Sequence, residues 1–261
     1  MLNYKIIAFS CNKLMVFGCL KVKVFNTHEQ LCFQAAVEVA RRIREKPDLV
    51  IALPTGGTPE KMYEYLVEMY KAGQVSYRNV RFFQLDEYLG VSKENPFSYY
   101  YYLKKRFFDQ ADINPDNIFS YDTLSEVPET ESIKYERAIR KAGGIDLVVL
   151  GIGNNGHIAF NEPGSKENSR TRVIDLDAST ISANSRYFSD IREVPRRAIT
   201  MGIATILEAR EIFLLAAGES KADAVFKSVR GPISGRIPAS FLRNHPKPVF
   251  FIDNMIKRLI F

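Results

Sequence analysis

Short runs of apolar residues alternate along this chain with longer stretches in which apolar residues recur every third or fourth position. The continuous short runs indicate strands buried on both faces, and the longer stretches indicate helices with one apolar side. Residues 20–25 alternate polar and apolar side chains, which also indicates a strand. We therefore expect strands at 20–25, 48–53, 80–85, 118–119, 145–150, 211–216 and 248–252. We expect helices after Thr27, from Thr58 to about Tyr70, and over about 96–108, 129–141 and 219–229.

The alternation predicts an α/β fold, in which helices cover both faces of a mostly parallel, Rossmann-like sheet. No linker, internal repeat or low-complexity stretch divides the chain, so residues 15–261 are expected to form a single three-layer αβα domain. Residues 1–14 precede the first convincing strand and are interpreted as an N-terminal extension of unknown role.

Two of the expected helices begin at recognisable caps. Thr27 is followed three residues later by Gln30, as in a capping box. Thr58 is a residue type favoured at N-caps, and Pro59, the next residue, fits the first helical turn. The first helix has an apolar stripe made of Leu31, Ala35, Val39 and Ile43.

Composition narrows the class of protein. The chain has 261 residues, 46% hydrophobic and 25% charged, so it can bury a core. The formal charge of +6 is either incidental or steers an anionic substrate, and no basic helix with interleaved aromatics indicates a nucleic-acid partner. No apolar run is long enough to span a membrane. Cys11, Cys19 and Cys32 lack metal-ligand spacing and are interpreted as reduced thiols of a cytoplasmic protein.

Three expected strands end in polar, acidic or glycine-rich turns, at residues 54–59, 86–90 and 151–163. Ligands of parallel α/β sheets bind where strands end and helices begin. Right-handed crossovers place all three turns at the same edge of the sheet, so we expect them to face one cavity.

The first turn contains Thr55, Gly56, Gly57 and Thr58 between a strand and a helix. Free backbone N–H groups and the helix dipole make such a turn an anion site, and a single phosphate fits better than a nucleotide. The alternative is an ordinary tight turn. Arg186 and Lys221 are candidates for further phosphate contacts, or simply exposed cations.

The other two turns carry the candidate acid–base residues. Asp86 lies where a buried strand surfaces, so burial should raise its pKa toward that of a general base; alternatively it caps the next turn. His157 has Glu162 in the same loop as an acceptor for one ring N–H, which leaves the other nitrogen to move a proton. No cysteine or second histidine lies nearby, so no metal is expected, and no nucleophile elbow is present. The set suits proton transfer on a phosphorylated sugar.

Read together, the motifs closely resemble those of the glucosamine-6-phosphate deaminase family over about residues 20–253. The matching stretches are Leu53-Pro-Thr-Gly-Gly-Thr-Pro59, Leu85-Asp-Glu-Tyr88, Gly151-Ile-Gly-Asn-Asn-Gly-His-Ile-Ala-Phe-Asn-Glu-Pro163, Ser169-Arg-Thr-Arg172 and Ala183-Asn-Ser-Arg-Tyr-Phe188. The resemblance implies conversion of glucosamine 6-phosphate to fructose 6-phosphate and ammonia, without metal or organic cofactor. The sequence does not decide between a monomer and a homo-oligomer.

The resemblance also implies roles for individual residues. His157 would protonate the ring oxygen and open the pyranose, with Glu162 orienting it. Asp86 would take the proton from C2 and deliver it to C1. The turn at 55–58, Arg186 and Lys221 match the family's phosphate site.

The chain departs from some family members at three places. Asn155 stands where larger members have Asp, which removes a charge from the histidine relay. Of the positions that bind an acetylated amino-sugar phosphate in allosteric members, only part remains, because the chain has Ser165, Lys166, Arg172 and Ile174 there. The long C-terminal tail of those members is also missing. We therefore expect no activation by N-acetylglucosamine 6-phosphate, which rate measurements at sub-saturating substrate would test.

Two other functions compete with this interpretation. A 6-phosphogluconolactonase shares the fold and a similar glycine–histidine stretch, but differs at 160–163 and 86–88. A catalytically inactive sugar-phosphate sensor would need a DNA-binding segment, and residues 1–20 are too short for a helix-turn-helix. Retention of Asp86, His157 and Glu162 also argues against the sensor.

Overall fold

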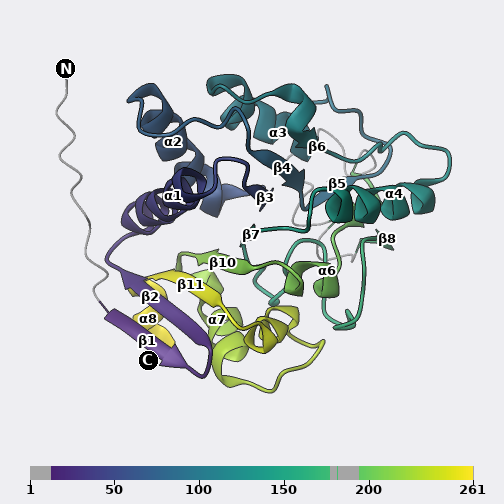
Figure 1. Ribbon diagram of the computed structural model, residues 1–261. Helices are drawn as coiled ribbons and strands as arrows, with labels where there is room; N and C mark the ends of the chain where they lie inside the picture. The colour runs from purple at the N-terminus through teal and green to yellow at the C-terminus, as the bar shows by residue number, and fades with distance from the viewer. Residues whose placement is uncertain (1–12, 177–180, 182–193, 261) are drawn as a thin grey trace.

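The computed structural model describes residues 13–176, 181 and 194–260, which contain an eight-stranded sheet with helices on both faces (Figure 1). The strand order is β1-β2-β11-β10-β7-β3-β4-β6, and all neighbours are parallel except β1 and β2. The strands are β1 (Lys13–Phe17), β2 (Leu20–Phe25), β3 (Val50–Leu53), β4 (Arg81–Gln84), β6 (Ile118–Phe119), β7 (Leu147–Leu150), β10 (Glu211–Ala216) and β11 (Pro248–Asp253).

The helices lie in two layers around this sheet. They are α1 (His28–Glu45), α2 (Gly57–Lys71), α3 (Tyr99–Arg106), α4 (Pro128–Lys141), α6 (Ile203–Leu207), α7 (Ala222–Arg230) and α8 (Asn254–Ile260). Short 3₁₀ turns occur at Phe108–Gln110, Pro115–Asn117, Glu219–Lys221 and Pro238–Asn244. None of these helices is long and apolar enough to cross a membrane.

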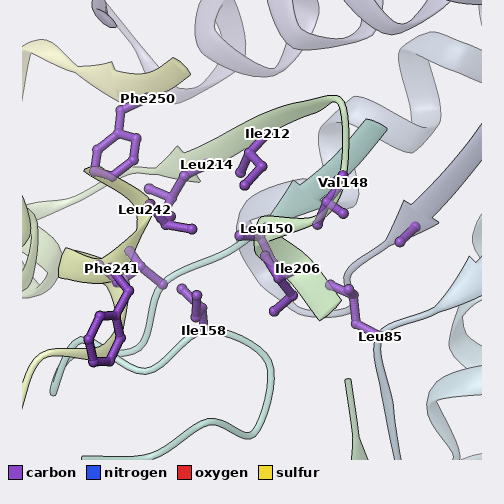
Figure 2. Packing of buried hydrophobic residues seen from close by; sticks show 14 of the residues in the cluster. Leu85, Val148, Leu150, Ile158, Ile206, Ile212, Leu214, Phe241, Leu242 and Phe250 are labelled. Carbon is purple, nitrogen blue, oxygen red and sulfur yellow. The ribbon is translucent and has the colours of Figure 1, made fainter. Parts of the chain in front are cut away.

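Alternate residues of the central strands enter two separate hydrophobic clusters, one on each face of the sheet. In β3, Ile51 and Leu53 pack with the apolar sides of α1, α2 and α3. Val50 and Ala52 point the other way, into the cluster that includes residues of α4, α6, α7 and α8. Figure 2 shows part of this second cluster, with Val148 and Leu150 of β7 beside Ile212 and Leu214 of β10. Burial on both faces confirms the predicted three-layer fold.

The predicted strands of the main sheet are all present, with ends that differ by up to two residues. The cap of α1 is also confirmed, since Thr27 Oγ1 accepts a hydrogen bond from the backbone N–H of Gln30 at 3.2 Å. The Gln30 side chain reaches back to the N–H of Asn26 at 3.1 Å, one residue earlier than in a standard capping box.

The structure differs from the sequence predictions in three places. A second, antiparallel sheet has the order β5-β9-β8 and was not expected; its strands are Asp86–Tyr88, Arg197–Thr200 and Arg172–Asp175. The expected boundary at residue 15 falls inside β1, which begins at Lys13. Thr58 is not the N-cap of α2. The N-cap is Gly56, so α2 begins at Gly57 and not at Pro59, where a Thr58 cap would start it. The φ of 115° at Gly56 is strained for any residue other than glycine.

The strand order reverses between β3 and β7. From β3 the chain moves outward through β4 to β6, then returns to place β7 on the other side of β3 and continues through β10 to β11. The loops that leave β3 and β7 at this reversal diverge toward opposite faces, and such a point is where ligands of open α/β sheets bind. The loops after β10, β7, β3 and β4, four consecutive strands, contain the candidate residues described next.

Candidate active site

The loop after β7 begins at Gly151 and holds its histidine by a close approach of ring and backbone. A Cβ atom built on Gly153 would lie 2.2 Å from Cε1 of His157 and 2.3 Å from its Nδ1. The backbone N–H of Gly153 also donates to the His157 carbonyl at 2.9 Å. Only glycine at position 153 therefore permits the imidazole to lie where it does.

Two buried side chains of the same loop, one apolar and one polar, anchor it to the core. Ile158 is fully buried in the hydrophobic cluster between the sheet and the helices of that face (Figure 2). Asn161 is also fully buried, and its side-chain amide donates to the carbonyls of Ile158 at 3.0 Å and Met201 at 2.8 Å. Its Oδ1 accepts from the guanidinium of Arg172 at 2.9 Å. Asn161 is thus a structural residue that fixes the loop carrying His157.

His157, Glu162 and Asn155 form one polar cluster on this loop. Nδ1 of His157 is buried and lies 3.1 Å from Oε1 of Glu162. The two atoms are within hydrogen-bonding distance but poorly aligned, so Glu162 is the near acceptor for this nitrogen without a fully formed bond. The other carboxylate oxygen, Oε2, accepts from Nδ2 of Asn155 at 2.6 Å. Oδ1 of Asn155 accepts from the backbone N–H of His157 at 3.2 Å, so Asn155 ties the two ends of the cluster together.

Asp86 is the first residue of β5 and is only 7% exposed. Burial raises the pKa of its carboxyl to about 8, and the neighbouring charge of Glu87 adds to the rise. No group among the described residues donates a hydrogen bond to this carboxyl, so nothing there offsets the cost of ionising it. A carboxyl of this kind is suited to take up and release a proton near neutral pH.

Asp86 is linked to the loop of His157 through the second sheet. Asp86 of β5 lies opposite Thr200 of β9 in the antiparallel register. Oγ1 of Thr200 accepts a hydrogen bond at 3.1 Å from the backbone N–H of Phe160, which belongs to the His157 loop. The ring of Phe160 packs against those of Tyr88 and Tyr99, with centroids 5.5 Å and 5.6 Å away. The small sheet therefore holds the end of β4 and the loop after β7 together.

Glu87 points away from Asp86, as the alternation of a strand requires. It is 2% exposed and accepts four hydrogen bonds, from the side chain of Gln84 and from the backbone N–H groups of Tyr88, Tyr99 and Tyr100. Burial raises its pKa, although these donors act against the rise. Glu87 thus satisfies the N-terminus of α3, a role that sequence reasoning did not assign to it.

The turn between β3 and α2 presents backbone N–H groups that have no partner in the part of the chain that the structure describes. No described group accepts a hydrogen bond from the backbone N–H of Thr55, Gly56, Gly57 or Thr58. The last two belong to the first turn of α2, whose N–H groups and dipole favour an anion. The carbonyls of Pro54, Gly56 and Thr58 are in contrast all taken by side-chain donors.

Of the two cations predicted to contact a phosphate, the structure describes Lys221 but not Arg186. Lys221 closes the 3₁₀ turn Glu219–Lys221 after β10, at the edge of the sheet that also carries the turn at 55–58. Arg186 lies outside the described residues, as does the whole stretch 183–188 around it.

Within the described residues, no group of three or more histidine, cysteine, aspartate or glutamate side chains is placed to hold a metal ion. The remaining two histidines have structural contacts. Nε2 of His245 donates to the carbonyl of Ala209 at 2.7 Å, and Nε2 of His28 lies 2.9 Å from the carbonyl of Thr58.

Comparison with known proteins gives a family. Residues 26–250 match the family described as glucosamine-6-phosphate isomerases/6-phosphogluconolactonase. The chain is 47% identical over 241 residues to a glucosamine-6-phosphate deaminase of Rhodopirellula baltica, which covers 92% of this chain and 96% of the relative. It is 44% identical to the glucosamine-6-phosphate deaminase of Thermoanaerobacter pseudethanolicus, over 92% of this chain and 95% of the relative.

Solved structures give the same result at two levels of similarity. One, described as a monomeric glucosamine-6-phosphate deaminase, superposes with a TM-score of 0.89 at 43% identity and covers 91% of this chain and 99% of its own. The 6-phosphogluconolactonase of Trypanosoma cruzi superposes with a TM-score of 0.76 at 23% identity, covering 94% and 98%. The second likeness concerns the fold alone.

Proposed function

The chain belongs to the family of glucosamine-6-phosphate isomerases and 6-phosphogluconolactonases, and on that premise we propose that it isomerises and deaminates glucosamine 6-phosphate to fructose 6-phosphate and ammonia. The observation that carries the proposal is the pairing of two proton-transfer groups at one sheet edge. His157 lies beside Glu162 on the loop after β7, and Asp86 is a buried carboxyl at the end of β4. These are the groups that ring opening and aldose–ketose isomerisation need.

Ring opening is assigned to His157. Its Nδ1 side is occupied by Glu162, so Nε2 is the nitrogen that can donate a proton to the ring oxygen of the sugar. To donate from Nε2 while Nδ1 faces Glu162, the ring must carry a proton on both nitrogens, and the Glu162 carboxylate orients this imidazolium and balances its charge. Asn155 holds Glu162 through the 2.6 Å contact to its other oxygen and acts as a neutral positioning residue.

Proton transfer between carbons is assigned to Asp86. Opening the ring exposes an aldehyde at C1, which acidifies the hydrogen at C2. The Asp86 carboxylate removes the C2 proton while the aldehyde oxygen takes up a proton from water, which gives an enolamine, and Asp86 then returns its proton to C1. The product is a C2 imine, and addition of water followed by loss of ammonia gives fructose 6-phosphate.

Binding of the phosphate is assigned to the turn at 55–58 together with Lys221 and Arg186. The unpaired N–H groups of the turn and the α2 dipole supply donors, and the two cations supply charge. The chemistry drawn here uses only side chains, backbone groups and water, so the proposal includes no metal or organic cofactor.

The setting proposed for this reaction is the cytoplasm, where the substrate is phosphorylated and thiols stay reduced. The buried thiol of Cys32, hydrogen-bonded to a backbone carbonyl, fits that setting. The sequence places an N-terminal extension at residues 1–14 and the catalytic domain at 15–261, and because β1 begins at Lys13 we propose to start the domain at that residue.

The proposal is tested by offering the purified protein two substrates in parallel. Glucosamine 6-phosphate should yield ammonia and fructose 6-phosphate, measured separately, whereas 6-phosphogluconolactone should not be hydrolysed above the background rate. Hydrolysis of the lactone without ammonia release from the amino sugar would favour the lactonase. Inactivity toward both substrates, with sugar-phosphate binding retained, would favour the sensor.

A further inference from the structure

Three carbonyls of the turn between β3 and α2 alternate with its free N–H groups, and a side chain from a different helix holds each of them. The hydroxyl of Tyr63 in α2 donates to the carbonyl of Pro54. The hydroxyl of Tyr102 in α3 donates to the carbonyl of Gly56 at 2.7 Å. In α1, Nε2 of His28 and Sγ of Cys32 lie 2.9 Å and 3.1 Å from the carbonyl of Thr58.

All four contacts have the side chain as donor. A carbonyl can only accept, so the proton on His28 must sit on Nε2. Burial raises the pKa of the Cys32 thiol to about 12, so this group keeps its proton and donates as well. Tyr63 is fully buried, and burial raises its pKa well above the ordinary tyrosine value, so its hydroxyl is also neutral.

These donors decide which way the peptide units of the turn face. A peptide carries its C=O and N–H in opposite directions, so fixing the carbonyl of residue 54, 56 or 58 away from the sheet edge turns the following N–H toward it. The N–H groups directed in this way are those of Thr55 and Gly57. Residue 59 is proline and has no N–H, so the contacts of His28 and Cys32 with the Thr58 carbonyl orient no donor and instead fix the start of α2. Gly56, with its φ of 115°, provides the backbone turn between them.

We propose that Tyr102 and His28 are positioning residues for the phosphate site: Tyr102 directs the N–H of Gly57 at the substrate phosphate, and His28 holds the start of α2, and with it the turn at 55–58, in place. This inference rests on the proposed function of that turn and extends it to residues that do not touch the substrate. The benefit is pre-organisation, because a turn already fixed by three helices loses little freedom when the phosphate binds. The expected consequence is a change in affinity for the phosphorylated substrate and not in the chemical step.

The test compares variants that remove one donor and keep an aromatic ring at the same position. Tyr102→Phe loses the hydroxyl while its edge contact with the Tyr63 ring remains, and His28→Phe loses the ring nitrogen. Each should raise KM for glucosamine 6-phosphate and the inhibition constant of inorganic phosphate by roughly 2–10-fold, the worth of one neutral hydrogen bond. The kcat value should stay within about twofold. His28→Gln, which restores an N–H donor, should recover part of the phosphate affinity.

Tyr65→Phe is the matched control. Its hydroxyl joins α2 to α1 by a 3.0 Å hydrogen bond to Glu29, and it has no hydrogen bond to the turn among the described residues. This variant should keep the wild-type KM and phosphate inhibition constant. The inference is overturned if Tyr102→Phe and His28→Phe leave phosphate affinity unchanged, if they lower kcat in place of affinity, or if Tyr65→Phe weakens phosphate equally.

Calorimetric titration of inorganic phosphate separates this inference from the proposed function, because it needs no turnover. A protein that releases no ammonia but loses phosphate affinity in Tyr102→Phe would contradict the deaminase and support the positioning role. An active deaminase whose phosphate affinity is the same in all four variants would support the deaminase function and contradict the positioning role.

Discussion

The imidazole of His157 occupies the space that a side chain at Gly153 would fill, since a Cβ there would lie 2.2–2.4 Å from three ring atoms. The two residues are four apart on one tight loop, and the backbone N–H of Gly153 closes the loop onto the His157 carbonyl at 2.9 Å. The glycine is therefore part of the histidine's position. Any larger residue at 153 must move the ring that is assigned to ring opening.

Gly153→Ala should lower kcat by roughly 10²-fold or more, the usual worth of a general acid that is lost or misplaced. Gly151→Ala is the control from the same loop, because a Cβ at 151 meets no atom within 4 Å and its φ is not in the left-handed region. Kinetics with glucosamine 6-phosphate and the melting temperature of both variants check this. Equal activity of the two variants would show that the His157 position is not critical.

The pH dependence of turnover should follow Asp86. The carboxyl must be ionised to remove the C2 proton, and its pKa is raised to about 8 by burial and the charge of Glu87. We therefore expect kcat/KM to rise about tenfold per pH unit below this value and to level off above it. A profile measured from pH 5 to 9 tests the assignment. A plateau that already starts near pH 5 would mean that Asp86 ionises like an ordinary carboxyl.

The same pKa predicts how stability depends on pH. Between the ordinary value of 3.8 and about 8, the folded protein binds a proton at Asp86 that the unfolded chain has lost. The free energy of unfolding from this group therefore falls as pH rises through that range. Asp86→Asn removes the effect, so it should match the wild type near pH 4 and exceed it by roughly 2–5 kcal/mol near pH 8. Urea unfolding at both pH values is the measurement, and a variant less stable at pH 8 would contradict the assignment.

Asn155 is predicted to matter through Glu162 and not through charge. Asn155→Leu removes the 2.6 Å donor to Oε2 of Glu162 and should lower kcat by about tenfold. Asn155→Asp places a second carboxyl beside Glu162, where one of the two must stay protonated and can still donate. Its activity should remain near wild type at low pH and decline at higher pH. If both variants show the wild-type kcat at every pH, the contact is not needed to position Glu162.

Sequence reasoning recovered seven of the eight strands of the main sheet, because most of them are short apolar runs, such as Leu147–Leu150, that a doubly covered sheet buries. It did not predict β1, most of whose residues are exposed. It missed the sheet β5-β9-β8, whose strands are brief and mix charged with apolar residues, as in Arg172–Asp175. Their pairing depends on where the long loops bring them, which periodicity cannot show. Thr58 was assigned as a cap from its residue type, but the left-handed φ of Gly56 decides where the helix starts.

For the candidate site, the sequence identified the residues that sit at strand ends but not those that support them. The glycines near His157 were visible as a motif, yet the contact between the Gly153 backbone and the ring was not. Glu87, Tyr102 and His28 contact segments distant in the chain, as Tyr102 contacts Gly56 at a sequence separation of 46. Such contacts leave no spacing signal in one sequence. The sequence signal for the role of Glu87 is the acidic pair Asp86-Glu87 at the end of a buried strand, because two adjacent carboxyls there point to opposite sides and need different partners.

The most direct test of the account is the conversion of glucosamine 6-phosphate by the wild type and by Asp86→Asn, with ammonia and fructose 6-phosphate measured separately. We predict equimolar products from the wild type and a loss of both products by roughly 10²–10⁴-fold in the variant. Absence of ammonia from the wild type, or wild-type turnover by Asp86→Asn, would contradict it.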